Sequence, residues 1–161
     1  MARRSDAWES TFTIDGSTYR ISTDPAEIDR DLVHRFLHDD SYWAAGVPRA
    51  VLDRAIDNSL SFGAYDEDGR QVAFGRVVTD GATFAWLADV FVVADLRGKG
   101  IGRFLVAAIV SHPDLQGLRW FLLATRDAHG LYRRFGFEDL TPERASRLMA
   151  VWRSSEDLYR P

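Results

Sequence analysis

The feature that most constrains this chain is a glycine-rich loop at residues 97–102, which reads Arg-Gly-Lys-Gly-Ile-Gly. The residues before it, 90–93, have the apolar pattern of a buried strand, and residues 101–109 after it have the pattern of a helix. A strand that turns through glycines into a helix leaves backbone N–H groups free at the positive end of the helix dipole. The sequence therefore predicts a phosphate-binding site, because glycine lets the backbone approach an anion with no Cβ in the way.

The spacing of the glycines distinguishes among phosphate ligands. A dinucleotide loop needs Gly-x-Gly-x-x-Gly, and neither Arg103 nor Leu105 supplies the last glycine. The nucleoside-triphosphate loop Gly-x-x-x-x-Gly-Lys-Ser/Thr does not occur in the sequence. A strand-to-helix turn that binds nothing remains an alternative interpretation of this loop.

A second motif lies at 131–137, which reads Leu-Tyr-Arg-Arg-Phe-Gly-Phe. Leu131, Tyr132 and Phe135 have helical spacing, and Gly136 is typical of a helix end. The two motifs, Arg-x-x-Gly-x-Gly followed by Leu-Tyr-x-x-x-Gly-Phe, resemble the signatures of the GNAT acyltransferase superfamily. The resemblance extends over roughly 60–140, a stretch that is similar to small bacterial members without an assigned substrate.

The resemblance implies the GNAT fold, an α+β domain with a mixed, mostly antiparallel central sheet of about six to seven strands flanked by about four helices. The residues themselves agree with this class. Helices are expected from Asp24-Pro25, from Pro48, after the glycine loop and around Tyr132. Strands are expected in a hairpin over 8–23 and at 60–65, 71–79, 83–93, 120–123 and 146–152.

Composition limits the classes of protein to which the chain can belong. At 161 residues it is expected to form a single domain over 1–161, with a flexible tail over 1–8. The sequence has no cysteine, which excludes disulfides, zinc–thiolate sites and a cysteine nucleophile. It has no signal-peptide pattern and no apolar run of membrane-spanning length, so we expect a cytoplasmic protein without a membrane partner. The net charge of −4 disfavours nucleic acid as a partner.

The resemblance implies acetyl-CoA as the cosubstrate. Backbone groups of Phe91 and Val92 are expected to pair with the pantetheine arm as an added strand would. Where many members carry an asparagine shortly before the motif tyrosine, this chain has Thr125, which can cap a helix and still form a hydrogen bond. The expected coenzyme-binding set is Phe91, Val92, Arg97, Gly98, Lys99, Gly100, Ile101, Gly102, Arg103 and Thr125.

Two residues are candidates for proton transfer. Tyr132 matches the tyrosine that many GNAT enzymes use as the general acid for the coenzyme A thiolate, and a phenol near pKa 10 can donate at neutral pH. Its alternative role is that of a core aromatic residue. Asp89 lies in an otherwise apolar strand, where a carboxylate is costly unless it is hydrogen-bonded or functional. We expect it to act as the general base, often through water in related enzymes, or else to have a structural role.

The acceptor site has weaker sequence signals. Tyr42 and Trp43 lie between the first two predicted helices, and an aromatic pair can hold a cation or a flat apolar group. Trp43 has the alternative role of anchoring the loop to the core. The histidines lack the spacing of metal ligands, so no metal site is expected.

The sequence thus indicates an N-acetyltransferase that moves an acetyl group from acetyl-CoA to the primary amine of a small molecule, by direct attack in a ternary complex. Three alternatives remain open. They are a protein acetyltransferase acting on N-termini or lysines, a non-catalytic acyl-CoA sensor, and an RNA-directed acetyltransferase, which the acidic net charge disfavours. An exposed last strand carrying Trp152 would support a homodimer.

Overall fold

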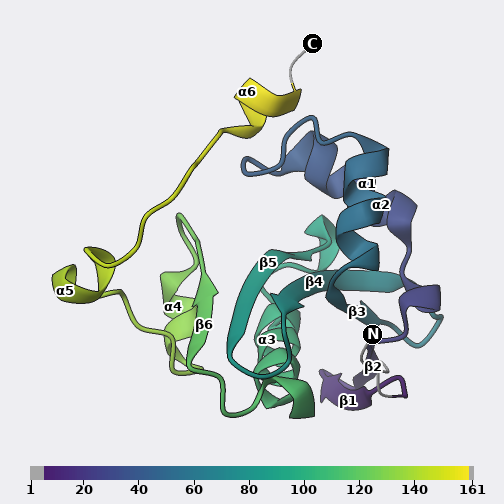
Figure 1. Ribbon diagram of the computed structural model, residues 1–161. Helices are drawn as coiled ribbons and strands as arrows, with labels where there is room; N and C mark the ends of the chain where they lie inside the picture. The colour runs from purple at the N-terminus through teal and green to yellow at the C-terminus, as the bar shows by residue number, and fades with distance from the viewer. Residues whose placement is uncertain (1–5, 160–161) are drawn as a thin grey trace.

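The computed structural model describes residues 6–159 and has the expected α+β class (Figure 1). Its strands form one sheet in the order β1-β2-β3-β4-β5-β6, so each strand lies beside its neighbour in sequence. Every adjacent pair is antiparallel except β5 and β6, which are parallel because a helix connects them. The strands are β1 (Glu9–Ile14), β2 (Ser17–Ser22), β3 (Leu60–Tyr65), β4 (Gln71–Thr79), β5 (Phe84–Val92) and β6 (Trp120–Leu123).

Tight turns connect the antiparallel strands as the sequence predicts. Asp15 and Gly16 between β1 and β2 have φ values of 49° and 83°, which is the left-handed backbone that a two-residue hairpin needs. Between β4 and β5 the Asp80 carboxylate accepts hydrogen bonds from the Thr83 hydroxyl and from backbone N–H groups of the same turn. These bonds, the Thr83 hydroxyl first, hold the pKa of Asp80 well below its usual range.

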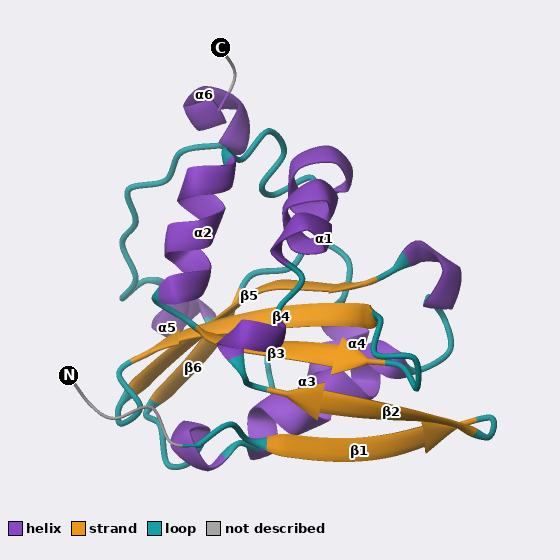
Figure 2. Ribbon diagram, turned by 90° about the vertical axis from the view of Figure 1, so that its right-hand side faces the viewer, coloured by secondary structure: helices purple, strands orange, loops and turns teal. Residues whose placement is uncertain are grey.

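Helices cover both faces of the sheet (Figure 2). On one face lie α1 (Arg30–Arg35), a π-helical turn (Phe36–Asp40) and α2 (Arg49–Asp57). On the other lie α3 (Ile101–Ser111) and α4 (His129–Arg133). Two further short helices, α5 (Pro142–Ala145) and α6 (Ser155–Tyr159), belong to the C-terminal segment.

The two faces of the sheet bury separate apolar cores. The α3 side includes Leu87, Leu105, Ile109 and Tyr132. The side of α1 and α2 includes Val33, Leu52, Phe74 and Phe91. Because β5 contributes Leu87 to one core and Phe91 to the other, this strand lies at the centre of the molecule.

The first predicted helix forms in two steps. The Asp24 side chain caps a short 3₁₀ turn, Pro25–Glu27, by accepting a backbone N–H. The chain then becomes extended at Ile28, and α1 begins only after Asp29, whose carboxylate caps it. The cap expected at Asp24 is therefore present, but the long helix starts later than the sequence indicated.

The strand predicted at 146–152 does not form, and that prediction was wrong. The side chains of Met149, Val151 and Trp152 are 98%, 94% and 79% exposed. An apolar run becomes a strand only where a neighbouring strand supplies hydrogen-bond partners, and none of the described strands pairs with it.

The flexible tail expected at 1–8 does not extend as far as Trp8. Residues 1–5 lie outside the described part of the chain. The Trp8 ring packs edge-on against Phe62 and His112 with centroid distances of 6.4 and 5.3 Å, and its backbone N–H donates to the Thr23 hydroxyl at 2.8 Å. These contacts fix the chain to the core from Trp8 onward.

Gly63 in β3 leads to a prediction about stability. A Cβ added there would lie 2.3 Å from the hydroxyl oxygen of Tyr65, a residue that is only 3% exposed. We expect Gly63→Ala to lower the free energy of unfolding by about 1–3 kcal/mol. Gly130→Ala is the matched control, because a Cβ at this position in α4 meets nothing within 4 Å. Urea unfolding measures the free energy of unfolding of both variants. A Gly63→Ala variant as stable as the parent would show that Tyr65 does not crowd this position.

Candidate functional site

The glycine loop connects β5 to α3. Gly98 and Gly100 have φ values of 77° and 98°, a backbone conformation that other residues rarely adopt. Gly100 is the N-cap of α3 and forms no side-chain cap, so the first N–H groups of this eleven-residue helix depend on water or a ligand. A Cβ added at Gly98 would meet nothing within 4 Å. The loop thus presents free donors and the positive helix end to open space, which suits a phosphate.

The first turn of α3 contributes to this candidate phosphate site mainly through its backbone. Ile101 is 1% exposed and belongs to the core, so only its N–H group is available to a ligand. At Gly102 a Cβ would lie 3.5 Å from the Val92 side chain, an ordinary contact, so glycine is not sterically required there. Arg103 is exposed beside them and supplies positive charge.

The other two basic residues of the loop differ from each other. Lys99 is exposed. Arg97 is held in place, because its Nε donates to the Val92 carbonyl at 3.1 Å and its Cζ lies 5.6 Å from the centre of the Phe36 ring. The Val92 carbonyl is one of the backbone groups expected to pair with pantetheine, and one of its lone pairs already accepts this hydrogen bond from Arg97.

β5 has an open edge just before the glycine loop. β6 pairs only with Phe84–Leu87, whereas β4 accompanies β5 as far as Val92. Over 88–92, no described strand lies on the β6 side of β5. Backbone groups of this edge, including those of Phe91 and Val92, are therefore accessible to an extended ligand that adds to the sheet as a strand would. The Phe91 ring is buried and stacks on Phe36 at 4.0 Å.

Asp89 occupies a β-bulge within this open stretch. The register of β4 against β5 shifts between Phe74 and Arg76, and Asp89 opposite the shift has a φ of 57°. Its carboxylate accepts a hydrogen bond from Arg76 Nε at 2.5 Å and another from the indole Nε1 of Trp43 at 2.9 Å. The side chains of Asp89 and Arg76 are only 9% and 18% exposed. The bulge thus directs the Asp89 carboxylate, which is mostly buried in its ion pair with Arg76, toward the loop that carries Trp43.

Tyr42 and Trp43 connect β5 to the segment that follows β6. Trp43 donates a hydrogen bond to Asp89 on β5. The Tyr42 hydroxyl accepts the backbone N–H of Arg126, just after β6, at 3.1 Å, and the Arg126 guanidinium carbon lies 3.8 Å from the centre of the Tyr42 ring. The two aromatic rings meet edge to face at 5.0 Å and are 44% and 40% exposed. Together they form an aromatic wall that spans from β5 to the segment after β6.

Tyr132 lies on α4 and is 8% exposed. It lines a cavity of about 260 Å³ together with Thr125 and His129. Burial raises the pKa of Tyr132 to about 12, and Tyr42 and Asp127 contribute in the same direction. Tyr132 is therefore protonated at neutral pH. Because Tyr42 contributes to this shift, the phenol groups of Tyr132 and of the aromatic wall interact electrostatically.

Thr125 lies in the turn before α4 but does not cap that helix, whose N-cap is Ala128 and which has no side-chain cap. Its hydroxyl accepts the backbone N–H of Ala128 at 3.0 Å, in the turn that leads into α4. Because it lines the same cavity as Tyr132, the remaining capacity of the hydroxyl is available to a ligand there.

The structure brings most of the predicted residues together in two places along β5, whereas Thr125 and Tyr132 line the cavity beside β6. The glycine loop is at the C-terminal end of the strand, and Asp89 with Tyr42 and Trp43 is nearer its middle. Sequence reasoning missed Arg76 and Arg126. Arg76 had a usable signal, because it is a single charge in an apolar strand, like Asp89. Arg126 had none, because only the fold brings it to Tyr42.

Residues 6–159 contain no group of three or more histidine, aspartate or glutamate side chains arranged to hold a metal ion. Within the same residues, no helix is long and apolar enough to cross a membrane.

Comparison with known proteins identifies the family. Residues 57–139 match the model of the acetyltransferase (GNAT) domain. A candidate acetyltransferase of Gibberella zeae is 32% identical over 143 residues, which are 75% of this chain and 80% of that protein. Serotonin N-acetyltransferase 2 of Oryza sativa, a chloroplast protein, is 35% identical over 123 residues, and the match spans 70% of this chain and 60% of the rice protein.

A solved structure agrees with these sequence matches. The crystal structure of a candidate GNAT acetyltransferase from Xanthomonas campestris superposes with a TM-score of 0.80 and 50% identity, covering 85% of this chain and 94% of that one. The glycine loop, Asp89 and Tyr132 all lie within the segment that the family model matches. This chain therefore belongs to the GNAT family of acetyltransferases.

Proposed function

We propose that the protein transfers an acetyl group from acetyl-CoA to the primary amine of a small molecule. The observation that carries the proposal is the open edge of β5, which ends in the glycine loop and starts beside Asp89. One extended ligand can therefore place a pyrophosphate at the start of α3 and a thioester near Asp89 and the aromatic wall. Members of the GNAT family use acetyl-CoA, whose length and charge suit this arrangement.

The residues present fit the coenzyme. Free N–H groups at the start of α3 suit its pyrophosphate, with Lys99 and Arg103 adding positive charge. The remaining backbone groups of Phe91 and Val92 suit the amides of pantetheine. Arg97 contributes by fixing the end of β5 through the Val92 carbonyl.

In the proposed reaction, the neutral amine attacks the thioester carbon, a C–N bond forms and the C–S bond breaks. Tyr132 donates its phenolic proton to the departing thiolate, which its raised pKa allows because the phenol stays protonated at neutral pH. Asp89 accepts the proton that the amine loses, through a water molecule, while Arg76 and Trp43 hold its carboxylate in position. Holding both reactants in one complex removes much of the entropic barrier.

The aromatic wall supports a small amine that carries an apolar or flat group. The exposed rings of Tyr42 and Trp43 offer such a group a surface beside Asp89. The acceptor named for the rice relative, serotonin, carries its primary amine on a short alkyl chain attached to an indole ring. Primary arylalkylamines are therefore the first candidates for the acceptor.

The proposal is tested in two steps. Calorimetric titration with acetyl-CoA and with free coenzyme A measures binding, and thiol release then reports turnover with arylalkylamines, simple aliphatic amines and lysine-containing peptides. Turnover with small amines supports the proposal. Turnover with peptides alone would assign a protein acetyltransferase, and coenzyme binding without any turnover would assign a sensor.

Tyr132→Phe tests the general acid. The substitution removes one hydroxyl and leaves the ring packed against Phe137, so we expect acetyl-CoA to bind with unchanged affinity. Turnover should fall by about 100-fold or more, the usual contribution of a positioned acid. Calorimetry and thiol release measure the two quantities on the same preparation. Undiminished turnover would assign Tyr132 to the core alone.

The pH dependence follows from the raised pKa of Tyr132. The active form is the protonated phenol, and an ordinary tyrosine loses its proton near pH 10. Because burial raises the pKa of Tyr132 to about 12, its proton is lost only as the pH rises through that value. We therefore expect kcat to show no alkaline decline from this residue up to about pH 10. A decline near pH 10 that disappears in Tyr132→Phe would contradict the assignment.

Asp89 has two separable roles, as base and as partner of Trp43. Asp89→Asn removes the base and should lower kcat by about 100-fold. Trp43→Phe is the matched control, because it removes the indole donor and leaves the Asp89–Arg76 pair. It should raise KM for the amine and keep kcat. An Asp89→Asn variant with the parental kcat would leave Asp89 only its structural role.

A further inference from the structure

Arg126 is a cation beside the acceptor wall that has no role in the reaction described above. Its guanidinium carbon lies 3.8 Å from the centre of the Tyr42 ring, and its backbone N–H donates to the Tyr42 hydroxyl at 3.1 Å. Both the backbone and the head of the residue are therefore held against one aromatic ring, although the residue is exposed. A cation held in this way loses less conformational entropy on binding an anion than a free surface arginine does.

The Arg126 guanidinium has no anionic partner in the part of the chain that the structure describes. No carboxylate of residues 6–159 forms an ion pair with it, and none of their oxygens accepts a hydrogen bond from it. Arg76, whose guanidinium also lies near the aromatic wall, is already paired with Asp89. The N–H donors of Arg126 are therefore available to a bound molecule.

Arg126 and Asp89 lie at opposite ends of the aromatic wall. The Trp43 indole donates to the Asp89 carboxylate at 2.9 Å. The Tyr42 ring meets the Trp43 ring edge to face at 5.0 Å and has the Arg126 guanidinium against its own face. Both charged residues follow the last positions that pair β5 with β6, Asp89 on β5 and Arg126 after β6. A bound molecule that contacts both charges therefore has to extend along both rings.

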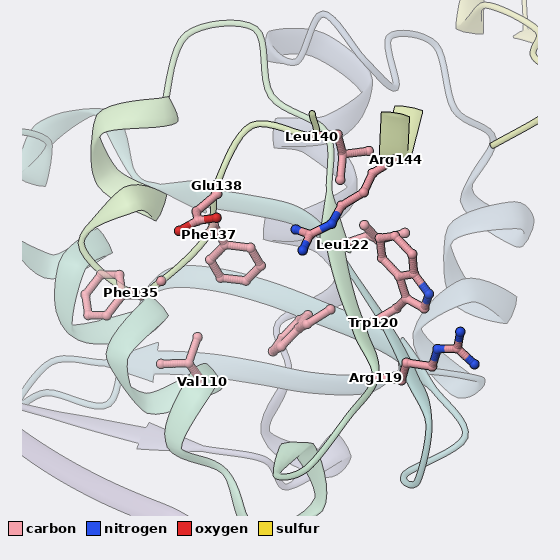
Figure 3. Close-up of a pocket in the computed structure, with 11 residues that line it drawn as sticks. Val110, Arg119, Trp120, Leu122, Phe135, Phe137, Glu138, Leu140 and Arg144 are labelled. Atoms are coloured by element: carbon pink, nitrogen blue, oxygen red, sulfur yellow. The ribbon is translucent and has the colours of Figure 1, made fainter. Parts of the chain in front are cut away.

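Two other arginines lie at a separate cavity. Figure 3 shows Arg119 and Arg144 beside Trp120, where they line a cavity of about 570 Å³. No residue of the aromatic wall or of the open edge of β5 lines this cavity. An anion bound there would not contact the residues proposed to position the acceptor, so Arg126 is the cation placed to bind a group of the acceptor itself.

We propose that the acceptor is a primary amine with a carboxylate at the opposite end of the molecule, and that Arg126 binds this carboxylate. Because the amine is placed at Asp89, the proposal rests on the proposed function. The planar guanidinium can donate two parallel hydrogen bonds to a carboxylate, and one unpaired guanidinium matches its single negative charge.

The part of the acceptor between its two charged ends is a flat apolar group that lies along Trp43 and Tyr42. An α-amino acid does not fit this arrangement, because its amine and its carboxylate are attached to the same carbon. The acceptor class is therefore an arylalkylamine whose carboxylate is on the far side of its ring.

Three related amines test the proposal by thiol release. Phenethylamine has no carboxylate, phenylalanine has one beside its amine, and the isomer para-carboxyphenethylamine has one at the far end of its ring. We expect kcat/KM to be at least about 10-fold higher for para-carboxyphenethylamine than for the other two, as a charge-assisted hydrogen bond allows. A kcat/KM for this amine no higher than that for phenethylamine would overturn the proposal.

Arg126→Gln assigns the preference to the guanidinium. The substitution removes the charge, so we expect the preference for para-carboxyphenethylamine over phenethylamine to fall at least about 10-fold, through a raised KM for the carboxylate-bearing amine. Arg119→Gln is the matched control, because it removes the same charge from an exposed residue of the separate cavity, and it should keep the parental preference. An Arg126→Gln variant with the parental preference would equally overturn the proposal.

Calorimetry with protein saturated with free coenzyme A distinguishes failure of this proposal from failure of the proposed function, because it requires no turnover. Tighter binding of para-carboxyphenethylamine than of phenethylamine, lost in Arg126→Gln, would support the carboxylate site even if no amine were acetylated, and the proposed function alone would then fail. Equal affinities for the two amines would overturn the carboxylate site, whether or not the protein acetylates amines.

Discussion

The short parallel pairing of β5 with β6 is the constraint on which the rest of the structure depends. Four residues of β6 accompany the first part of β5, and β5 then continues to Val92 with only β4 beside it. The chain must leave β5 through the glycine loop and cross by α3 to reach β6, because parallel neighbours need a crossover. The open edge of β5 and the free N–H donors at the start of α3 therefore both result from the crossover between β5 and β6. Both are accessible to the same extended ligand.

The bulge at Asp89 links this backbone site to the side chains that surround it. An ordinary strand residue at that position would alternate with its neighbours, whereas the positive φ of Asp89 turns its carboxylate to Arg76 and Trp43. Removing an aspartate from water is costly unless donors replace the lost hydrogen bonds, and these two residues provide them. The indole thereby fixes the loop that also carries Tyr42, so the geometry of the aromatic wall depends on the buried carboxylate of Asp89.

The sequence predicted those parts of the molecule that local pattern determines. The hairpin at Asp15 and Gly16, the strand bounds of β3 to β6 and the glycine turn all follow from alternation and from backbone conformations that few residues adopt. The partners of Asp89 could not be predicted, because Trp43 reaches it across 46 positions of the chain and only the packed fold brings them together. The strand expected at 146–152 failed for a related reason, since a strand exists only in relation to a neighbour that a single sequence does not reveal.

The same short β6 accounts for the apolar surface at the edge of the sheet. On its β5 side the strand ends early and leaves room for a ligand, and on its other side it ends the sheet with no partner among the described strands. An edge strand with apolar side chains on both faces is prone to pair with another strand. The chain also carries a five-residue run, 148–152, that is apolar at every position and is not used in its own core. The edge and this run are exposed for the same reason, because neither has a further strand beside it among the described residues.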